Sequence, residues 1–403
     1  MTPTYRVSAN GADLTAKLKT CLISLTINDE VGINSDTVEI QIDDRDGAVQ
    51  LPAFGADLVV GIGYTETGIV AKGRYRVDEI ECEGPNRRML IRARAADTNA
   101  ITTLSHIKAG VFRSWVGKTI ADVATVLAKE NGWGTVSITD EIIANAKTPT
   151  DQQTGQSDLD YLKLIARDSG GQVKPANGQL LIFRQATAAA VSASGKPMPT
   201  VSVIPSDCMR WRCLMTRRSS HKKVAAGWTD SNGVTQYEVA ESADSSEEDS
   251  ISYLPETFSD QGTARNAATA KVNALDIGSE SVSLSLVGNP QIGVEVKLNL
   301  VGFKAGVDRV WIAARVQHKI DEQGYTTEVE AVKQLEWGAL PESLRVTGAA
   351  TPPPEVRGAA LADAGARGLG HPEQVVLRVQ QAQLASVAGS ELENRDSGFI
   401  SHA

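Results

Sequence analysis

Short runs of alternating hydrophobic and polar residues cover most of the chain, and turn residues separate them. From Tyr5 to about Ala96 these runs are "CLISLTIND", "TVEIQIDDRDG", "ADLVVGIGY" and "YRVDEIECEGPNRRMLIRARA". A period of two residues is typical of a strand with one buried face, and the Gly, Asp and Pro residues between the runs mark turns. Many short strands at this spacing predict a barrel or a sandwich.

A second alternating stretch, residues 311–331, predicts a β-hairpin that includes a histidine. On the first arm, alternate residues are expected to face inward: Ile312, Ala314, Val316, His318 and Ile320. The residues between them are expected to face outward: Ala313, Arg315, Gln317 and Lys319. After a turn at 321–324, the return arm is expected to bury Thr327, Val329 and Ala331 and to expose Thr326, Glu328 and Glu330.

Between residues 110 and 185 the period changes from that of a strand to that of a helix. In "KTIADVATVLAKENGWG", Ile120, Val123 and Leu127 recur at helical spacing after Thr119, a suitable N-cap. A second helix is predicted in "SDLDYLKLIARDSGG" and a strand in "NGQLLIF". A further helix is predicted over about 260–276, capped by Ser259 or Asp260. Residues 106–186 are therefore predicted to form a small α+β insert.

Two distant parts of the chain resemble each other. In "LPAFGADLVVGIGY" (51–64) and "NPQIGVEVKLNLVGF" (289–303), Pro52 and Gly55 match Pro290 and Gly293, and an alternating strand follows each pair. Downstream, "GRYRVDEIECEGPNRRMLIRARA" matches the hairpin "DRVWIAARVQHKIDEQGYTTEVEA" arm for arm. This self-similarity predicts an internal duplication.

The patterns together predict a mainly β protein with an α+β insert. The expected domains are a first barrel-like domain at 1–105, the small βααβ module at 106–186, a linker at 187–200, a second barrel-like domain at 201–337 and an extended, flexible C-terminal arm at 338–403. The arm is rich in Ala, Gly and Pro and lacks alternation, as "ATPPPEVRGAALADAGARGLGHPEQ" shows.

Composition narrows the classes of function. The chain has 403 residues, 41% of them hydrophobic, and a formal net charge of −9, which argues against nucleic acid as the main partner. We expect no membrane anchor, because no apolar run approaches the length of a membrane span, and no Sec-type signal. Four cysteines in so long a chain do not make a disulfide scaffold, so synthesis in a reducing cytoplasm is expected.

The candidates for chemistry are few, and each has a structural alternative. His318 is better explained as a buried, hydrogen-bonded histidine than as an acid or base. Cys208 and Cys213, with His221 as the one further ligand, lack the spacing of a metal site and are better explained as small apolar strand residues. The acidic segment 241–250 lacks the spaced ligands of a calcium loop. No catalytic motif is present, so no cofactor, metal or enzymatic activity is predicted.

A basic segment, "RWRCLMTRRSSHKK" at 210–223, surrounds Trp211 with arginine and lysine. Such a segment could bind a nucleic-acid backbone. The preferred alternative is that its charges meet the acidic segment or a neighbouring subunit, since the whole chain is acidic. Sequence-specific binding of nucleic acid is not expected.

Five segments in order resemble the late control protein D family of contractile-tailed phages, which is similar to the hub part of VgrG-type proteins. They are "GKTIADVATVLAKENG", "SDLDYLKLIARDSGG", "LPETFSDQGTARNAATAKVNAL", "GNPQIGVEVKLNLVGF" and "WIAARVQHKIDEQGYTTEVEA". Each segment alone is weak, but their order is specific, and the resemblance runs from about Tyr5 to Trp337. The arm after Trp337 has no counterpart in the family's pattern.

The resemblance implies a structural tail hub, a homotrimer whose two barrel-like tube domains per chain form a pseudo-sixfold ring. The implied partners are the tail tube protein, the spike protein and other baseplate proteins, with the tape measure protein as a candidate. The implied location is the baseplate of a virion or tail-like particle. The alternative function is a tail component that binds or hydrolyses peptidoglycan, since the insert resembles small wall-binding modules. The candidate assembly surface is Trp311, Arg315, His318, Tyr325, Glu328, Tyr75 and Arg76.

Overall fold

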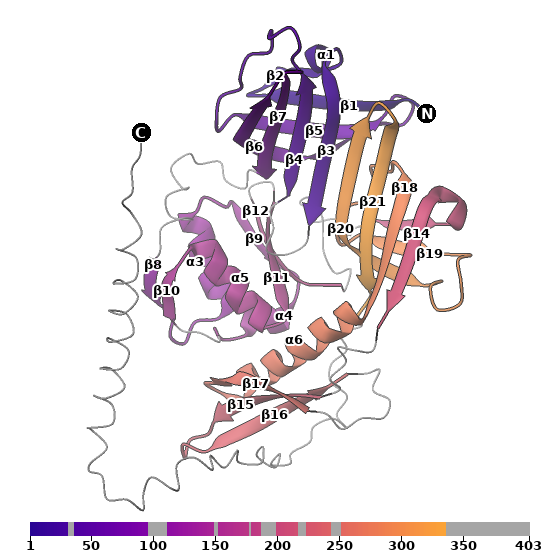
Figure 1. The fold of residues 1–403 in the computed structure, drawn as a ribbon. Helices are drawn as coiled ribbons and strands as arrows, with labels where there is room; N and C mark the ends of the chain where they lie inside the picture. Colours follow the sequence, from indigo (N-terminus) through magenta and orange to yellow (C-terminus); the bar gives the residue numbers. More distant parts are fainter. Residues whose placement is uncertain are drawn as a thin grey trace, which may run out of the picture. The chain divides into compact units, whose positions relative to one another are not determined.

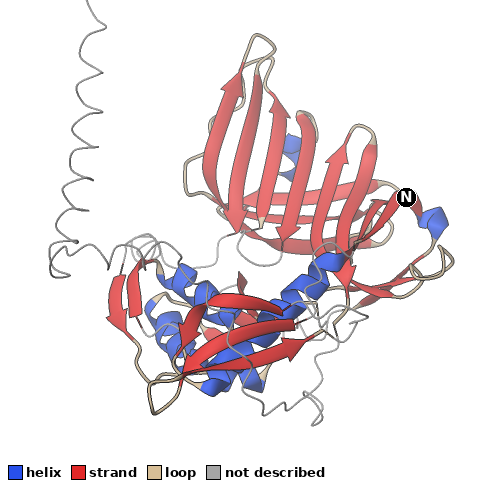
Figure 2. Ribbon diagram, turned by 60° about the horizontal axis from the view of Figure 1, so that its bottom comes forward, coloured by secondary structure: helices blue, strands red, loops and turns tan. Residues whose placement is uncertain are grey.

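Strands make up most of the residues that the structure describes, and the prediction of a mainly β fold with an α+β insert is confirmed (Figures 1 and 2). The computed structural model describes residues 1–30, 36–95, 111–148, 152–176, 179–186, 199–216, 223–242 and 251–335. The predicted C-terminal arm at 338–403 and nearly all of the predicted linker at 187–200 lie outside the described residues.

One large sheet dominates the described residues, and its first part is built from the N-terminal strands. These are β1 (Pro3–Ala9), β2 (Ala12–Asp13), β3 (Leu22–Glu30), β4 (Thr37–Asp43), β5 (Asp57–Tyr64), β6 (Gly68–Glu83) and β7 (Arg88–Ala95), with the short helix α1 (Thr15–Leu18) after β2. Their order across the sheet is β3-β4-β7-β6-β5-β1-β2. Alternate residues face one apolar core, which includes Leu25, Ile40, Val60 and Tyr75. We call this part the first copy.

The second part of the sheet, here called the second copy, repeats this order with later strands. These are β13 (Thr200–Val203), β14 (Cys208–Met215), β18 (Glu280–Val287), β19 (Lys297–Leu300), β20 (Val310–Asp321) and β21 (Gly324–Lys333), with the 3-10 helix η1 (Pro205–Asp207) before β14. The order β14-β18-β21-β20-β19-β13 matches β3-β4-β7-β6-β5-β1 strand for strand. The last pair differs, because β1 is antiparallel to β5 whereas β13 is parallel to β19.

Two β-bulges recur at matching places and support the predicted duplication. β3 carries a bulge between Leu22 and Ser24 opposite β4, and β14 carries one between Cys208 and Arg210 opposite β18. Likewise β6 and β20 each have a bulge, at 77–79 and 313–315, opposite β7 and β21. A bulge is an extra residue that shifts all later pairing, so two coincident bulges are strong evidence of a common origin.

The bulges also correct one detail of the predicted repeat. Gly55 N donates to Val77 O, and Glu295 N donates to Ala313 O, so Glu295 is the structural counterpart of Gly55. Both residues have positive φ angles, +77° at Gly55 and +61° at Glu295. The match of Gly55 with Gly293 was therefore wrong by two residues, because a glycine is common at such a bend but not obligatory.

The hairpin β20–β21 forms as predicted on one arm and only partly on the other. On β21, Thr327, Val329 and Ala331 are buried while Glu328 and Glu330 are exposed. On β20 the alternation holds from Val316 to Ile320, but Ala313, predicted to face outward, is completely buried in the second core. The bulge explains the error, since the extra residue inverts the two faces on one side of it.

The insert between the copies has its own apolar core and contains the predicted helices. Its elements are β8 (Val111–Ser114), α3 (Ile120–Glu130), β9 (Thr135–Ile138), α4 (Glu141–Asn145), β10 (Gln152–Gln156), α5 (Asp158–Asp168), β11 (Gly171–Ala176) and β12 (Gln179–Arg184). Thr119 and Asp122 form a capping box at α3, and Ser157 caps α5. The additional helix α4 and strands were not predicted, because they are too short to show a clear period.

A second α/β element interrupts the second copy between β14 and β18. It comprises β15 (Lys223–Thr229), β16 (Thr235–Glu241), β17 (Ile251–Phe258) and α6 (Gln261–Ser279). Asp260 caps α6 as predicted, and Ala264, Ala268 and Val272 pack against the sheet of β15–β17. In the first copy, β3 ends at Glu30 and β4 begins at Thr37, so only six residues of sequence separate them. The two copies therefore share a sheet but differ in what is attached to it.

The apolar face of β21 provides a test of the fold. Val329 is 1% exposed in the second core, and its neighbour Glu328 is exposed on the opposite face. Val329→Asp should lower the free energy of unfolding by more than about 3 kcal/mol, because it buries an unpaired charge. Glu328→Lys, the matched control, should change it by less than about 0.5 kcal/mol. Urea unfolding followed by circular dichroism measures both, and a stable Val329→Asp variant would contradict this fold.

Candidate assembly interface

The two copies are joined edge to edge by one pair of antiparallel strands, β3 and β20 (Figure 1). The pairing runs from Arg315 opposite Glu30 to Asp321 opposite Ser24. Side chains reinforce it on the polar face, where Arg315 Nε lies 3.0 Å from Glu30 Oε1 and Gln317 Nε2 donates to Asn28 Oδ1 over 2.7 Å. We call this strand pair the seam.

The tip of the β20–β21 hairpin completes the core of the first copy. Ile320 and Tyr325, which are 7% and 4% exposed, belong to the apolar cluster of the first copy and not to that of the second. Tyr325 packs against Tyr64 with ring centroids 5.5 Å apart, and Tyr64 Oη donates to Gly288 O over 2.8 Å. A Cβ on Gly288 would come within 2.2 Å of the Tyr325 ring, so this close approach requires glycine.

His318 lies at the centre of the seam and is 1% exposed. Its Nε2 is 2.8 Å from Lys72 Nζ and 3.0 Å from Ile292 O, and its Nδ1 is 3.1 Å from Thr327 Oγ1 and 2.9 Å from Tyr325 Oη. A neutral imidazole with its proton on Nδ1 fits this network, because Lys72 then donates to both Nε2 and Ile292 O.

Electrostatics keep this histidine neutral. The pKa of His318 is lowered to about 3. Burial is the main cause, and the positive charge of the adjacent Lys72 is the second. Burial also lowers the pKa of Lys72 to about 8. A group that stays unprotonated over the physiological range and is closed off from solvent is placed for hydrogen bonding, so the structural interpretation of His318 is preferred over an acid–base role.

A partly buried cluster of charges joins the insert to the first copy. Lys174, on β11, donates from Nζ to Asp29 Oδ1 over 2.7 Å and lies 3.1 Å from Asp36 Oδ2. Asp29 Oδ2 also accepts from Val294 N over 3.0 Å, which ties the second copy to the same carboxylate. Sequence reasoning missed this cluster, since its members lie in three separate segments and belong to no motif.

The charges of this cluster depend on one another. Burial, together with the Asp29 charge, raises the pKa of Asp36 to about 7. Burial acts against ionisation of Asp29 too, but the Lys174 charge outweighs it and lowers the pKa of that carboxyl. Asp29 and Asp36 in turn raise the pKa of Lys174 despite its burial. Lys174 is therefore the cation that makes two close carboxylates tolerable at the junction.

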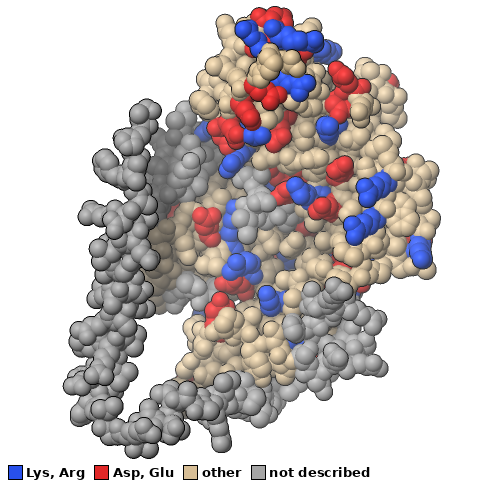
Figure 3. Space-filling view, in the orientation of Figure 1, with Lys and Arg blue, Asp and Glu red and all other residues tan. Residues whose placement is uncertain are grey.

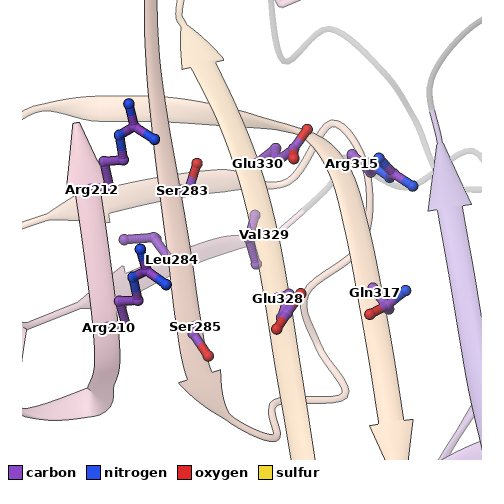
Figure 4. Close-up of a pocket in the computed structure, with 10 residues that line it drawn as sticks. All are labelled: Arg210, Arg212, Ser283, Leu284, Ser285, Arg315, Gln317, Glu328, Val329 and Glu330. Atoms are coloured by element: carbon purple, nitrogen blue, oxygen red, sulfur yellow. The ribbon is translucent and has the colours of Figure 1, made fainter. Parts of the chain in front are cut away.

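The solvent-facing side of the sheet carries interspersed charges of both signs (Figure 3). In the first copy Arg92, on β7, bonds to Glu79 and lies 3.4 Å from Glu39 and 3.6 Å from Glu81. In the second copy the small side chains of Ser283 and Ser285 leave a hollow of about 360 Å³ between the arginines of β14 and the glutamates of β21 (Figure 4). Arg210 and Arg212 line one side of it.

The predicted assembly surface divides into buried and exposed residues. Trp311, His318, Tyr325 and Tyr75 are all at most 4% exposed and support the protomer's own cores. Arg315 and Glu328 are exposed on the polar face, and Arg76 is partly exposed beside Asp57. Trp311 and Tyr75 precede the bulges of β20 and β6. Each bulge changes which alternate residues face the core, and the hydrophobic pattern of the sequence did not show this change. The role of the exposed three in assembly stays a prediction.

The large sheet has several edges without a strand partner among the described residues, and two of them correspond to the strands of the seam. β14 pairs only with β18, and β6 pairs only with β7 beyond Val77. On β14, Trp211, Leu214 and Met215 are 40%, 49% and 50% exposed. An open edge with exposed apolar side chains is a site for pairing with another chain.

The other candidates from the sequence have ordinary environments where they are described. Cys208 and Cys213 are partly buried free thiols on β14, and burial raises the pKa of each. His221 and the segment 243–250 lie outside the described residues. Within the described residues, no cluster of His, Cys, Asp and Glu is arranged to hold a metal ion, and no helix is long and apolar enough to span a membrane.

Sequence comparison finds similar proteins over most of the chain. The probable baseplate hub protein of Escherichia phage 186 is 27% identical over 374 residues, and that of Escherichia phage P2 is 28% identical over 373 residues. Each alignment covers 83% of this chain and 94% of the phage protein. No family model matches the chain.

Structure comparison finds the same fold in solved tail proteins. The tail protein from Neisseria meningitidis MC58 is similar with a TM-score of 0.62 and 12% identity, over 83% of this chain and 97% of that one. The 43 kDa tail protein of prophage MuSo2 from Shewanella oneidensis has a TM-score of 0.59 and 13% identity, over 82% and 98% of the two chains. By fold, the chain resembles phage tail proteins. By sequence it resembles baseplate hub proteins, so the predicted resemblance to tail hubs is confirmed.

The charge cluster at the junction predicts a specific cost of removing its cation. Lys174→Met should lower the free energy of unfolding by about 1.5–3 kcal/mol, because two partly buried carboxylates lose their shared partner. Lys129→Met, at an exposed position on α3, is the matched control and should change it by less than about 0.5 kcal/mol. Adding Asp36→Asn to Lys174→Met should recover part of the loss. Equal effects of the two lysine variants would contradict the cluster.

The buried neutral histidine predicts a dependence of stability on pH. The pKa of His318 is about 6.5 in the unfolded chain and about 3 in the folded protein, so the unfolded state binds more protons between these values. Stability should therefore fall as the pH drops through that window, by up to about 1.4 kcal/mol per pH unit from this group. His318→Gln should flatten the slope.

The contribution of Asp36 has the opposite sign, because its pKa is raised in the folded state, but it is the same in both proteins and cancels in the comparison. Urea unfolding at a series of pH values from about 4 to 7 measures both slopes. Parallel slopes for the wild type and His318→Gln would mean that the pKa of His318 is not lowered in the folded protein.

Proposed function

We propose that the chain is a structural baseplate hub of a contractile tail, in which three copies form a ring with pseudo-sixfold symmetry. In this role the ring connects a hexameric tail tube to a trimeric spike and contacts other baseplate proteins. The similarity to probable baseplate hub proteins of phages 186 and P2, over nearly their whole length, supports the hub role.

The observation that carries the proposal is the seam between two equivalent units of one sheet. β3 of the first copy pairs with β20 of the second, while their counterparts β14 and β6 keep open edges. The chain thus contains one example of the contact and the two halves of a second one. Three chains that repeat it would place six similar sheet units around an axis.

The two open edges belong to different strands, so contacts between chains are head-to-tail. Head-to-tail contacts generate a closed ring when the rotation between neighbours permits closure. A closed ring covers the open edges of β14 and β6, which lowers the tendency of such edges to aggregate. Two units per chain also explain how a threefold assembly presents six similar surfaces to a sixfold tube.

The proposed role is structural, and the buried polar groups of the seam fit it. Lys72 donates to His318 Nε2 and to Ile292 O, which ties the first copy to the second, and Lys174 attaches the insert to Asp29. We assign no enzymatic step to them. The protein would be made in the bacterial cytoplasm and incorporated into a virion or tail-like particle.

The oligomeric state and the shape of the purified protein test the proposal. Sedimentation equilibrium should give a mass of three chains of 42.8 kDa, and electron microscopy should show a ring with a central channel of near-sixfold outline. The ring should also co-sediment with polymerised tail tube protein of the same particle. A stable monomer or dimer, or a trimer without a channel, would refute the hub assignment.

A further inference from the structure

The duplication fixes which residues of β14 and β6 correspond to those of the seam. Directly after the matching bulges, Glu79 lies opposite Arg92 on β7 and Arg315 lies opposite Glu330 on β21, so Glu79 corresponds to Arg315. Three residues further along each strand, Cys82 corresponds to His318. Cys213 corresponds to Ile27 in the same way, since Cys213 lies opposite Val282 as Ile27 lies opposite Val38. In the seam, His318 lies opposite Ile27.

We propose that β14 of one chain pairs antiparallel with the free edge of β6 in a second copy, with Cys82 opposite Cys213 and Glu83 opposite Arg212. This pairing rests on the proposed ring and specifies its contact between chains. It transfers the seam's own pairing, including Lys319 opposite Thr26, to the open edges without a shift. The partner is another copy of this chain.

The charges near the two edges are complementary. The free part of β6 presents Glu79, Glu81 and Glu83 on the polar face, whereas β14 presents Arg210 and Arg212 on the same face. In the seam the signs are reversed, since β20 contributes Arg315 and β3 contributes Glu30. If β6 paired with β3, its glutamates would lie beside the acidic Glu30. If β14 paired with β20, its arginines would lie beside a strand that is itself basic. Both pairings would bring like charges together. The charges thus favour alternation of first and second copies.

The apolar side chains at the two edges also lack the cover that the seam provides. Leu25 is 1% exposed under the hairpin tip, but its counterpart Trp211 is 40% exposed. In the seam Leu25 lies opposite Ile320, whereas β6 ends at Glu83, so Trp211 would lie beside the start of the β6–β7 turn at Gly84. A Cβ on Gly84 would meet no atom within 4 Å in the protomer, which leaves space there for the indole.

The native cysteines allow a direct test in the full-length protein. Directly opposite residues in antiparallel strands have Cα atoms about 4.5–5.5 Å apart, within the range that a disulfide spans. Oxidation with diamide at mildly alkaline pH should join Cys82 to Cys213 of the next chain, with two electrons and two protons passing to the diamide. A non-reducing gel should then show covalent dimers and trimers.

Single serine variants identify the cysteines that react. Cys82→Ser and Cys213→Ser should each abolish the covalent species, whereas Cys208→Ser and Cys21→Ser, which change the other two thiols, should keep them. Coexpressed Cys82→Ser and Cys213→Ser chains should yield covalent dimers that contain one of each. Covalent species that persist in Cys82→Ser would overturn the pairing.

A charge exchange tests the same register without oxidation. Glu83→Arg and Arg212→Glu should each weaken trimer formation by about 5-fold per interface, and the double variant should restore it. Glu322→Arg, at the exposed β20–β21 turn, is the matched control and should leave the trimer unchanged. Loss of the trimer that the double variant does not restore would overturn the contact between Glu83 and Arg212.

Mass measurements separate failure of this pairing from failure of the hub proposal. A native trimer that forms no Cys82–Cys213 crosslink would leave the ring in place and overturn the register proposed for it. A monomeric native protein would overturn both. A crosslinked species that stops at the dimer would indicate a twofold contact and also overturn the pairing.

Discussion

The backbone hydrogen bonds between β3 and β20 are the interaction on which the rest of the structure depends. They turn two sheet units into one continuous sheet and bring the β20–β21 tip, with Ile320 and Tyr325, into the core of the other unit. Without this pairing both units would expose an edge and the first core would be open at one side. The seam is therefore an interface between two units that is hydrogen-bonded and packed like the interior of a single domain.

The polar groups of the seam add specificity where an apolar contact would only add burial. His318, Lys72, Asp29 and Lys174 come from the first copy, the second copy and the insert, and each has a hydrogen-bonding partner from another of these parts. Burying charged groups has a desolvation cost that their pairing offsets only in a correct geometry. These polar groups fix the register of β20 against β3, because any sliding of one strand along the other would separate hydrogen-bond donors from acceptors.

Much of the local structure follows from sequence periodicity, whereas the seam does not. The hairpin at 311–331 and the helices after Thr119, Ser157 and Asp260 were predictable, because spacing and capping residues act within a few positions. The burial of Trp311 was not predictable, since a bulge inverts the faces of β20 without changing the composition of the strand. The contacts of Lys174 depend on residues about 140 positions away in the chain, and no local pattern records them.

The coincident bulges have a consequence for the history of the gene. The two copies share the same bulge positions although equivalent side chains carry opposite charges, as at Arg92 and Glu330 or Glu79 and Arg315. A recombination event that made the two halves of the gene identical again would place like charges together at the seam, where Arg315 now meets Glu30. The two halves are thus not interchangeable, because the seam depends on the difference in charge between them.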